Sequence, residues 1–144
     1  MKKWIPVLIL TFVLGISMYF IKNEDKVTAS IFINEVCSSS TNIVTEEYIS
    51  GDYIELYNAT EETVCLAGWM LSDERNNLDK HILPEIYIEA QGYVLLFADG
   101  VGKQENTVSF KLSQDGESLF LTEPSGNVED QTYIPRLDLN HAYA

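Results

Sequence analysis

Glu35 and Glu55 are the acidic residues best placed to do chemistry, because each lies inside a run of apolar residues. Two carboxylates that face each other at a suitable distance act as acid and base in glycoside hydrolysis. Such carboxylates can equally be structural and accept hydrogen bonds from loop N–H groups or tyrosine hydroxyls. We favour the structural role and keep a small glycan hydrolase as the alternative.

The sequence carries no pattern typical of an enzyme active site. It has no GxSxG, HExxH or P-loop motif, and Ser38-Ser39-Ser40 lacks the flanking glycines of a nucleophile elbow. We therefore assign no catalytic residue and no cofactor-binding residue. The expectation is a protein that is not an enzyme.

The first 21 residues predict a membrane helix. The run from Trp4 to Ile21 carries no charged side chain and is long enough to cross the hydrocarbon region of a bilayer. Lys2 and Lys3 precede it and should stay in the cytoplasm, which sends the rest of the chain outside. We expect residues 1–21 to be a signal anchor that places the protein in the cell membrane as a single-pass protein.

A polar linker over residues 22–30 follows the predicted anchor. The linker contains an alternative to a permanent anchor, since Val27 and Ala29 are small residues at the −3 and −1 positions of a signal-peptide cleavage site. Cleavage after Ala29 would release the protein as a secreted one. Both alternatives put the remaining residues outside the cytoplasm.

Cys37 and Cys65 are the only cysteines, and both lie in the part predicted to be exported. A disulfide between them is possible there and would stabilise the fold by roughly 3–4 kcal/mol in the chain-entropy model. The alternative is a pair of unpaired thiols, and the spacing alone leaves both open. Two sulfurs are too few for a zinc site, and His81 and His141 add no ligand spacing.

The loop after residue 72 is a weak candidate for calcium binding. Its oxygen-bearing side chains are those of Asp73, Glu74, Asn76, Asn77 and Asp79. Calcium takes six to eight oxygens, and this loop lacks the residue order and the glycine of an EF-hand. We prefer a solvated acidic loop without metal, both here and for a second group formed by Glu46, Glu47 and Asp52.

Charge argues against nucleic acid as a partner. The whole chain has a formal charge of −13, and from Ser30 onward five basic residues stand against 20 acidic ones, a charge of −15. Such a surface repels phosphate backbones and acidic envelope polymers. A protein or a neutral glycan fits this charge better.

The rest of the chain predicts β-strands separated by turns, without a sustained helical stripe. We predict strands over Ile31–Cys37, Tyr53–Ala59, Thr63–Leu66, Trp69–Leu71, Ile86–Ile88, Tyr93–Ala98, Thr107–Leu112, Ser118–Thr122 and Val128–Tyr133. Tyr93–Ala98 is apolar on both faces, which predicts a central strand. Asp115-Gly116 predicts a hairpin between Thr107–Leu112 and Ser118–Thr122. This spacing of strands is typical of a β-sandwich or small barrel.

Six motifs in order resemble the lamin tail domain family. They are Ile31–Val36, Asp52–Asn58, Leu66–Asp73, Leu95–Ala98, Phe110–Ser113 and Gly116–Leu121. The resemblance implies an all-β, immunoglobulin-like β-sandwich over residues 31–134, preceded by the N-terminal helix and followed by a C-terminal tail over 135–144. It also implies structural roles for Glu35, Glu55, Asn58, Gly68, Trp69 and Asp73.

The expected function is that of a non-catalytic interaction module held at the outer face of a bacterial membrane. Its ligand would be a surface protein or a neutral envelope glycan. Bacterial relatives also join this domain to spore-coat kinase-like domains. A second expectation is therefore an N-terminal accessory domain from a truncated spore-coat kinase-like protein.

Overall fold

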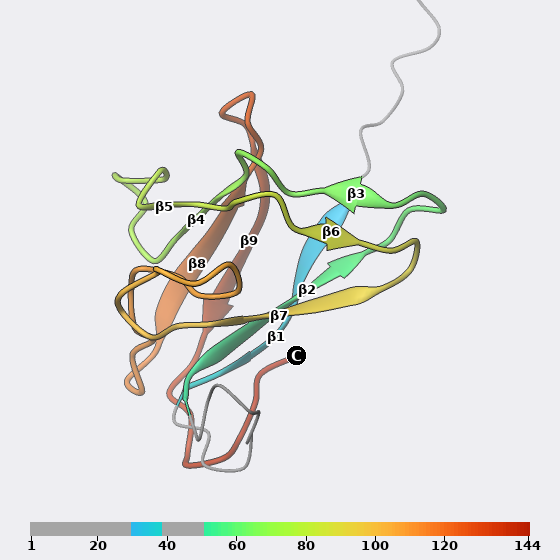
Figure 1. Cartoon of the computed structure of the whole chain (residues 1–144). Coiled ribbons are helices and arrows are strands. Elements are labelled where there is room, and N and C mark those ends of the chain that lie inside the picture. Colours follow the sequence, from blue (N-terminus) through green and yellow to red (C-terminus); the bar gives the residue numbers. More distant parts are fainter. Residues whose placement is uncertain (1–29, 39–50) are drawn as a thin grey trace, which may run out of the picture.

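The computed structural model describes residues 30–38 and 51–144, and this part of the chain consists of strands without a helix (Figure 1). The strands are β1 (Ile31–Cys37), β2 (Tyr53–Asn58), β3 (Val64–Cys65), β4 (Met70–Ser72), β5 (His81–Ile82), β6 (Tyr87–Ile88), β7 (Tyr93–Phe97), β8 (Glu117–Thr122) and β9 (Val128–Ile134). Within the described residues no helix is long and apolar enough to span a membrane. The helix predicted over residues 4–21 lies outside the described residues.

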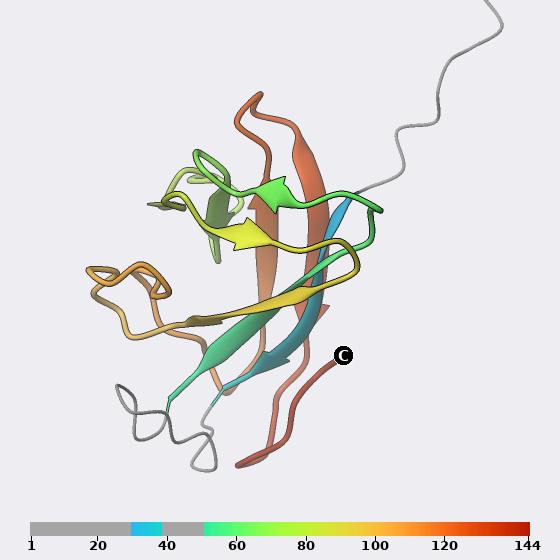
Figure 2. The same cartoon turned by 45° about the vertical axis from the view of Figure 1, so that its right-hand side comes forward.

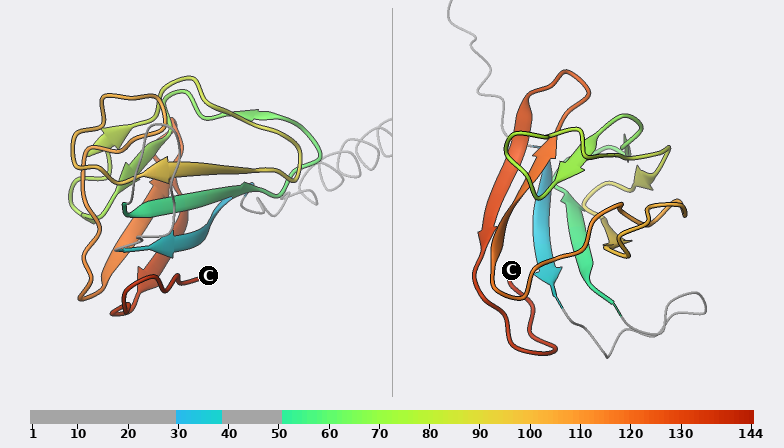
Figure 3. Two further views of the ribbon diagram at one scale, coloured as in Figure 1. Left: turned by 60° about the horizontal axis from the view of Figure 1, so that its bottom comes forward. Right: turned by 90° about the vertical axis from the view of Figure 1, so that its left-hand side faces the viewer.

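The strands form two main layers. One is a three-stranded sheet in the order β1-β2-β7, and the other is a four-stranded sheet in the order β5-β4-β8-β9. A two-stranded sheet of β3 and β6 lies beyond the end of β2 (Figures 1 and 2). In the right-hand view of Figure 3, β8 and β9 (orange to red) lie on one side and β1 and β2 (blue and green) on the other. The described part of the chain is therefore the all-β sandwich that the sequence predicts.

The core lies between the two layers and follows the alternation of the strands. Ile54 and Leu56 on β2 are fully buried, and so are Leu119 and Leu121 on β8. Burying a leucine or isoleucine stabilises a fold by about 1.5–3 kcal/mol relative to leaving it exposed. Trp69 packs into the same core with 8% of its surface exposed.

A β-bulge in β1 decides which of its side chains enter the core. The register shifts between Ile33 and Glu35, so that Glu35 pairs with Glu55 of β2. An extra residue in one strand reverses the faces of all later side chains. Because of the bulge, Val36 is buried in the core while Glu35 stays on the outer face of the sheet.

The prediction of a strand over Thr107–Leu112 is wrong. Only Thr107 makes a ladder contact there, an isolated parallel bridge to Phe97. The alternation itself is present, because Val108, Phe110 and Leu112 are buried. The backbone N–H groups of this segment bond to separate partners, namely Phe97 of β7, a loop carbonyl oxygen and the side chains of His81 and Asp52, so burial alternates without a continuous ladder.

The predicted Asp115-Gly116 hairpin is also wrong. The strand β8 pairs with β4 and β9 and has no partner strand in Thr107–Leu112. Gly116 nevertheless has a φ of +97°, and a Cβ at this position would lie 2.8 Å from the carbonyl oxygen of Ile134. The turn signal was real, but it marks a close approach to β9 and not a two-strand hairpin.

The prediction that Tyr93–Ala98 is a central strand is wrong as well. The central strand is β2, and β7 lies at the edge of the sheet and pairs antiparallel with β2 alone among the named strands. Leu96 faces the core, and Phe97 on the other face is buried beside Cys37 and Tyr53. Both faces are apolar because both are partly covered, although only one side of the strand has a partner strand. The short strand β5 was missed.

Candidate functional site

The two edges of the β1-β2-β7 sheet are the part of the described molecule where backbone groups could meet a partner. An edge strand presents a row of N–H and C=O groups that can pair with another chain. One edge is formed by β1 and the other by β7. Their hydrogen bonds show which of them is accessible.

Side chains of β9 close the first half of the β1 edge. The Glu129 carboxylate accepts hydrogen bonds from the N–H of Ser30, from its hydroxyl at 3.0 Å and from the N–H of Ile31 at 3.4 Å. The Asp130 carboxylate accepts the N–H of Ile33 at 2.8 Å. Carboxylates of the opposite layer therefore occupy donors that another strand would use.

The C-terminal residues close the second half of the β1 edge. Val36 and Tyr143 exchange two backbone hydrogen bonds of 2.8 Å each, which form an isolated antiparallel bridge. The Cys37 thiol donates to the carbonyl oxygen of His141 at 3.2 Å. Figure 3 shows the end of the chain running alongside β1. The segment predicted as a tail is thus paired with the sheet.

At the β7 edge, the alternation of hydrogen bonds decides which residues are available. The ladder with β2 is flanked by a bond from Asn58 N–H to Gly92 O at 3.0 Å and one from Ala98 N–H to Asp52 O at 2.9 Å. In an antiparallel pair every second residue bonds to the neighbouring strand. The even-numbered residues of β7 therefore bond to β2, and the odd-numbered residues point their backbone groups toward the open side.

In the part of the chain that the structure describes, one of these odd-numbered residues is covered. The N–H of Phe97 donates to Asn106 O at 2.8 Å, and its carbonyl oxygen accepts the N–H of Val108 at 2.9 Å. Within the described residues, Tyr93 and Leu95 make no backbone hydrogen bond on this side. The edge of β7 is therefore open over the length of these two residues.

A cleft of about 530 Å³ adjoins this open edge. It is lined by Ile86, Val94, Gln104, Glu105 and Asn106. Two apolar residues from the strand region thus face three polar residues from the loop that covers Phe97. A cleft of this size accommodates side chains of a partner, with an apolar wall and a polar rim.

Aromatic residues follow the outer face of the sheet next to the open edge. Tyr57 of β2 lies opposite both Phe32 and Tyr93, and the Tyr57 and Tyr93 rings stack with centroids 4.7 Å apart. Tyr93 keeps 57% of its surface exposed. A stacked tyrosine pair with one exposed ring can receive a cation, a sugar or another aromatic group.

Glu35 and Glu55 lie directly opposite each other on this outer face, as neighbours across β1 and β2. The Tyr53 hydroxyl donates to Glu35 at 2.5 Å, and the Asn34 amide donates to Glu55 at 2.7 Å. Burial, together with this bond to Glu35, raises the pKa of Tyr53. These are the hydrogen bonds expected of structural carboxylates, and neither Glu35 nor Glu55 lines the cleft.

The disulfide considered for Cys37 and Cys65 is not formed, and both cysteines are free. Cys37 lies on β1 opposite Tyr53, whereas Cys65 lies on β3 opposite Tyr87. The two strands belong to different sheets, so compartment alone was an insufficient guide. Burial raises the pKa of the Cys37 thiol, and Asp52 and Glu35 add to the effect.

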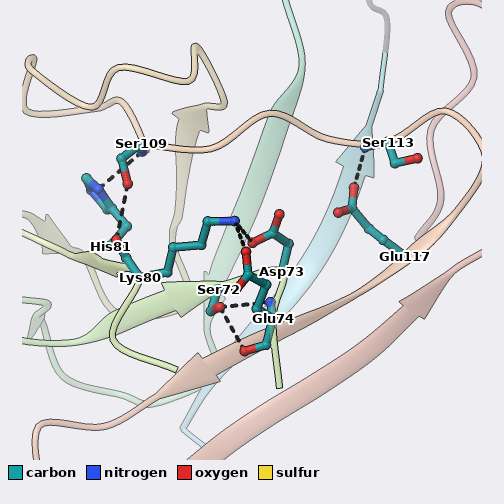
Figure 4. Close-up of polar contacts among 8 residues, drawn as sticks. All are labelled: Ser72, Asp73, Glu74, Lys80, His81, Ser109, Ser113 and Glu117. Carbon is teal, nitrogen blue, oxygen red and sulfur yellow. Dashed lines mark hydrogen bonds and ion pairs between the residues drawn. The ribbon is translucent and has the colours of Figure 1, made fainter. Parts of the chain in front are cut away.

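The candidate calcium loop holds a lysine instead (Figure 4). The Lys80 ammonium forms ion pairs with Asp73 at 2.7 Å and with Glu74 at 2.6 Å. The Lys80 hydrogen bond and charge lower the pKa of Glu74. Ser72 ties the start of the loop, because its hydroxyl accepts the N–H of Glu74 at 2.8 Å.

No group of three or more histidine, cysteine or acidic residues in the described ranges is arranged to hold a metal. Among the acidic residues of the second group, Glu46 and Glu47 lie outside the described residues, so only Asp52 can be placed. Its carboxylate accepts the N–H of Leu112 at 3.2 Å. A calcium site remains a prediction that the described residues do not support.

His81 connects β5 to the loop that covers Phe97 (Figure 4). Its Nδ1 accepts the N–H of Ser109 at 3.2 Å, and the Ser109 hydroxyl donates to the carbonyl oxygen of Lys80 at 3.2 Å. His81 is 9% exposed, and burial lowers its pKa while the nearby Asp99 acts in the opposite direction. A neutral ring keeps Nδ1 as an acceptor, which this contact requires.

Farther along the same segment, the Ser113 N–H donates to the Glu117 carboxylate at 2.5 Å (Figure 4). Burial raises the pKa of Glu117, and this hydrogen bond opposes the shift. The segment is thus attached to β8 at one end and to β5 near its middle.

Asn58 is the most connected of the residues to which the resemblance gives a structural role. It is fully buried, and its amide donates to the carbonyl oxygens of Glu62 at 2.7 Å and of Ile88 and Glu89 at 3.0 Å. Its own oxygen accepts the N–H and the hydroxyl of Thr60. One side chain therefore joins the end of β2 to the loop after it and to β6.

Gly68 and Trp69 form the turn between β3 and β4. Gly68 has a φ of +81°, a region that residues with a Cβ rarely adopt, and its N–H donates to Leu83 O at 3.0 Å. The carbonyl oxygen of Trp69 accepts the N–H of Leu83 at 2.7 Å. The glycine is needed so that the chain can turn the tryptophan into the core.

Sequence reasoning missed the open edge because it is a property of backbone groups. Tyr93 and Leu95 were read as part of a central strand from their apolar side chains. One sequence signal of an edge position is Tyr93, an amphipathic residue that follows directly on a turn. The structure places Gln91 of this turn at a φ of 53°. The turn marks where β7 starts, but it does not reveal which neighbour is absent.

Comparison with known proteins gives one finding on the family. Residues 24–135 match the family described as Lamin Tail Domain. The match includes all nine described strands and ends one residue after β9. Domains of this family are immunoglobulin-like β-sandwiches that serve in interactions and are not catalytic. No curated protein matches the chain.

Proposed function

Because the chain belongs to the Lamin Tail Domain family, we propose that it is a non-catalytic protein-binding module held at the outer face of a bacterial membrane. Residues 4–21 would form the single transmembrane anchor, with Lys2 and Lys3 in the cytoplasm. The binding partner would be a surface protein.

The observation that carries the binding proposal is the open edge of β7 beside a cleft of about 530 Å³. Loops and edges on a rigid sandwich are common places for recognition. The Glu35–Glu55 pair supports no hydrolytic alternative of comparable weight, because its carboxylates are hydrogen-bonded to Tyr53 and Asn34 away from the cleft.

Membrane topology is tested by labelling single cysteines in intact cells with a maleimide that does not cross membranes. In a background with Cys37→Ser and Cys65→Ser, Ser125→Cys puts a single thiol on the exposed turn between β8 and β9. We expect this thiol to be labelled before lysis, and a cysteine inserted between Met1 and Lys2 to be labelled only after lysis. The reverse order would contradict the orientation, and recovery of the domain in the medium would favour cleavage after Ala29.

Binding is tested with the full chain in lipid nanodiscs and an extract of envelope components. We expect retained material that disappears when the extract is treated with protease, and that survives treatment with glycosidases. Sensitivity to glycosidase alone would favour the neutral-glycan alternative. Loss of binding on chelation would revive the calcium site, and an in-frame kinase-like continuation of the gene would favour the accessory-domain alternative.

A further inference from the structure

We propose that the open edge of β7 receives a short extended peptide as an added strand, in which an apolar residue is flanked by two basic residues. This inference rests on the proposed protein-binding function and names the chemistry of the partner. The backbone groups of Tyr93 and Leu95 provide the pairing, since within the described residues no backbone bond occupies them. Strand addition to an exposed edge draws its affinity from main-chain hydrogen bonds and its specificity from alternate side chains.

The pleat of β7 determines which side chain of the peptide meets which surface. Val94 faces inward opposite Leu56, and it lines the cleft together with Ile86. The residue of an added strand that lies beside Val94 faces the same way, because side chains on neighbouring strands share a face. That residue points into the cleft and meets Val94 and Ile86, so an apolar side chain of medium size fits it.

The residues before and after it point to the outer face. One of them lies beside Tyr93, whose ring is exposed and stacked on Tyr57, and the other lies beside Leu95, which is opposite Glu55 of β2. A lysine or arginine over a tyrosine ring gains a cation–π interaction. The Tyr93 ring at one flanking position and the acidic Glu55 behind the other both favour a basic residue, so the pattern along the peptide is basic, apolar, basic.

Charge selects a basic peptide as well. Glu105 lies at the rim of the cleft, and Glu85 precedes the cleft residue Ile86. Lys103 is the basic residue on the same loop, so the acidic side chains outnumber it locally, and from Ser30 onward the chain carries a formal charge of −15. A second copy of this chain carries the same charge and is repelled, whereas a basic segment is attracted.

The two edges of the sheet also point to a single place of addition. At the β1 edge, Glu129, Asp130 and Tyr143 already hold the backbone groups. At the β7 edge, the segment around Thr107 shows that a chain running parallel to β7 can bond there, because it pairs with Phe97. An added peptide would extend this short ladder toward Tyr93.

The experiment measures binding of a fluorescent synthetic peptide with the core Arg-Val-Arg to the full chain in nanodiscs. A peptide with Glu-Val-Glu at the same positions is the matched ligand control. We expect the basic peptide to bind at least about tenfold more tightly at low salt, with a difference that shrinks at about 0.5 M salt. Equal binding of the two peptides, or no binding of either, would overturn the proposal.

Variants of the protein test the place of binding. Glu105→Lys should weaken binding about threefold to tenfold, whereas Asp138→Lys, which makes the same charge change on the exposed C-terminal segment beside the other edge, should change it less than about twofold. Leu95→Pro removes one N–H of the open edge without removing a bond to β2 and should weaken binding more than about tenfold. Equal losses in Glu105→Lys and Asp138→Lys would overturn the assignment to the β7 edge.

A peptide variant keeps the test decisive even if Leu95→Pro fails to fold. Methylating alternate N–H groups of the Arg-Val-Arg peptide blocks strand addition in one of the two phases while leaving the protein intact. We expect one methylated phase to lose binding and the other to retain it. Hydrogen exchange should slow at Tyr93 and Leu95 on binding and remain unchanged at Ile33. Binding without slower exchange at Tyr93 and Leu95 would contradict strand addition.

The outcomes also separate this inference from the function on which it rests. If no peptide binds but the nanodisc protein still retains protease-sensitive envelope material, the peptide chemistry is wrong and the binding function stands. If neither binds, both are wrong. If the full chain alone forms dimers that Leu95→Pro disrupts, a second copy occupies the edge and the proposed partner is wrong.

Discussion

The β1 edge and the β7 edge belong to the same sheet but differ in how far their outward backbone groups are hydrogen-bonded. At β1, the N–H groups of Ile31 and Ile33 meet carboxylates from β9, and Val36 pairs with Tyr143. At β7, the contacts among residues 30–38 and 51–144 cover Phe97 alone, through Asn106 and Val108. Proteins usually protect their edges because an exposed edge invites aggregation. Within the described residues, the two edges of one sheet therefore differ in how many of their backbone groups are occupied.

The two coverings also differ in what they are made of. The β1 edge is closed at several separate points, by the carboxyl side chains of Glu129 and Asp130 and by the backbone near the chain end. The β7 edge is closed over one residue by a loop that itself depends on the contact between His81 and Ser109. The following predictions perturb one edge, the other, or the strand between them.

Replacing Asn58 with alanine should have the largest effect, because Asn58 is the last residue of β2, the central strand that pairs with both β1 and β7. The change removes the buried amide that joins Glu62, Ile88 and Glu89 and should lower the free energy of unfolding by about 2–4 kcal/mol. Denaturant unfolding measures this. Asn127→Ala, in the exposed turn between β8 and β9, is the control and should cost less than about 0.5 kcal/mol. Similar losses in both variants would contradict the role of Asn58.

Replacing Asp130 with alanine should open the first half of the β1 edge. The N–H of Ile33 loses its acceptor, and we expect a loss of about 1–2 kcal/mol in unfolding free energy together with faster hydrogen exchange at Ile33. Asp130→Asn keeps an acceptor oxygen and should recover much of the loss. If exchange at Ile33 were as slow in the alanine variant as in the wild type, the carboxylate would not be closing this edge.

Replacing Tyr143 with proline should open the second half of the β1 edge. Proline lacks the N–H that donates to Val36 O, so unfolding free energy should fall by about 0.5–1.5 kcal/mol. The Cys37 thiol, which donates to His141 O, should then react faster with a maleimide. Tyr143→Phe keeps the backbone bond and serves as the control. An unchanged labelling rate at Cys37 would show that the chain end does not cover it.

Lowering the pH should act on the β7 edge and produce the smallest effect. Burial lowers the pKa of His81 from its ordinary value of 6.5, so the unfolded chain binds this proton at a higher pH than the folded one. Stability from this group is therefore complete above about pH 6.5 and decreases as the pH falls through the lowered pKa. A protonated ring also stops accepting the N–H of Ser109, so exchange at Ser109 should become faster in acid.

His81→Gln is the control for the pH prediction. Glutamine offers an acceptor oxygen to Ser109 and does not titrate. Unfolding free energies measured near pH 7.5 and near pH 5.5 should differ less in this variant than in the wild type. The carboxyl groups are the same in both proteins, so their contribution to the pH dependence cancels in the comparison. An identical pH dependence in the two proteins would contradict a buried neutral His81.

Much of the fold could be predicted because strand periodicity reports burial directly. Ile54 and Leu56 alternate with polar and aromatic residues along β2, and the structure buries these two residues as expected. The alternation of Val108, Phe110 and Leu112 predicted both that these side chains are buried and that the segment is a strand. The burial is confirmed. The strand prediction failed because alternation shows which side is buried and does not show whether a neighbouring strand exists.

The candidate site was less predictable, for a related reason. The residues that close the β1 edge lie far away in the chain, with Ile33 and Asp130 separated by 97 positions. The choice between a disulfide and free thiols stayed open in the sequence for the same reason, because it depends on the placement of Cys37 and Cys65, which lie on different sheets and are free. Contacts between distant segments depend on topology, which composition and periodicity do not encode locally.

By itself, the sequence determined the family, the all-β class, the acidic charge and the buried faces of the main strands, because these follow from residue types and their local order. The resemblance to the lamin tail domain family implied structural roles for Asn58, Gly68 and Trp69. Only the tertiary structure decided that β7 is an edge, that Lys80 binds the acidic loop, and that one edge is closed while the other is open. Hydrogen bonds between strands join residues far apart in the chain, so their presence or absence appears only when the layers are assembled.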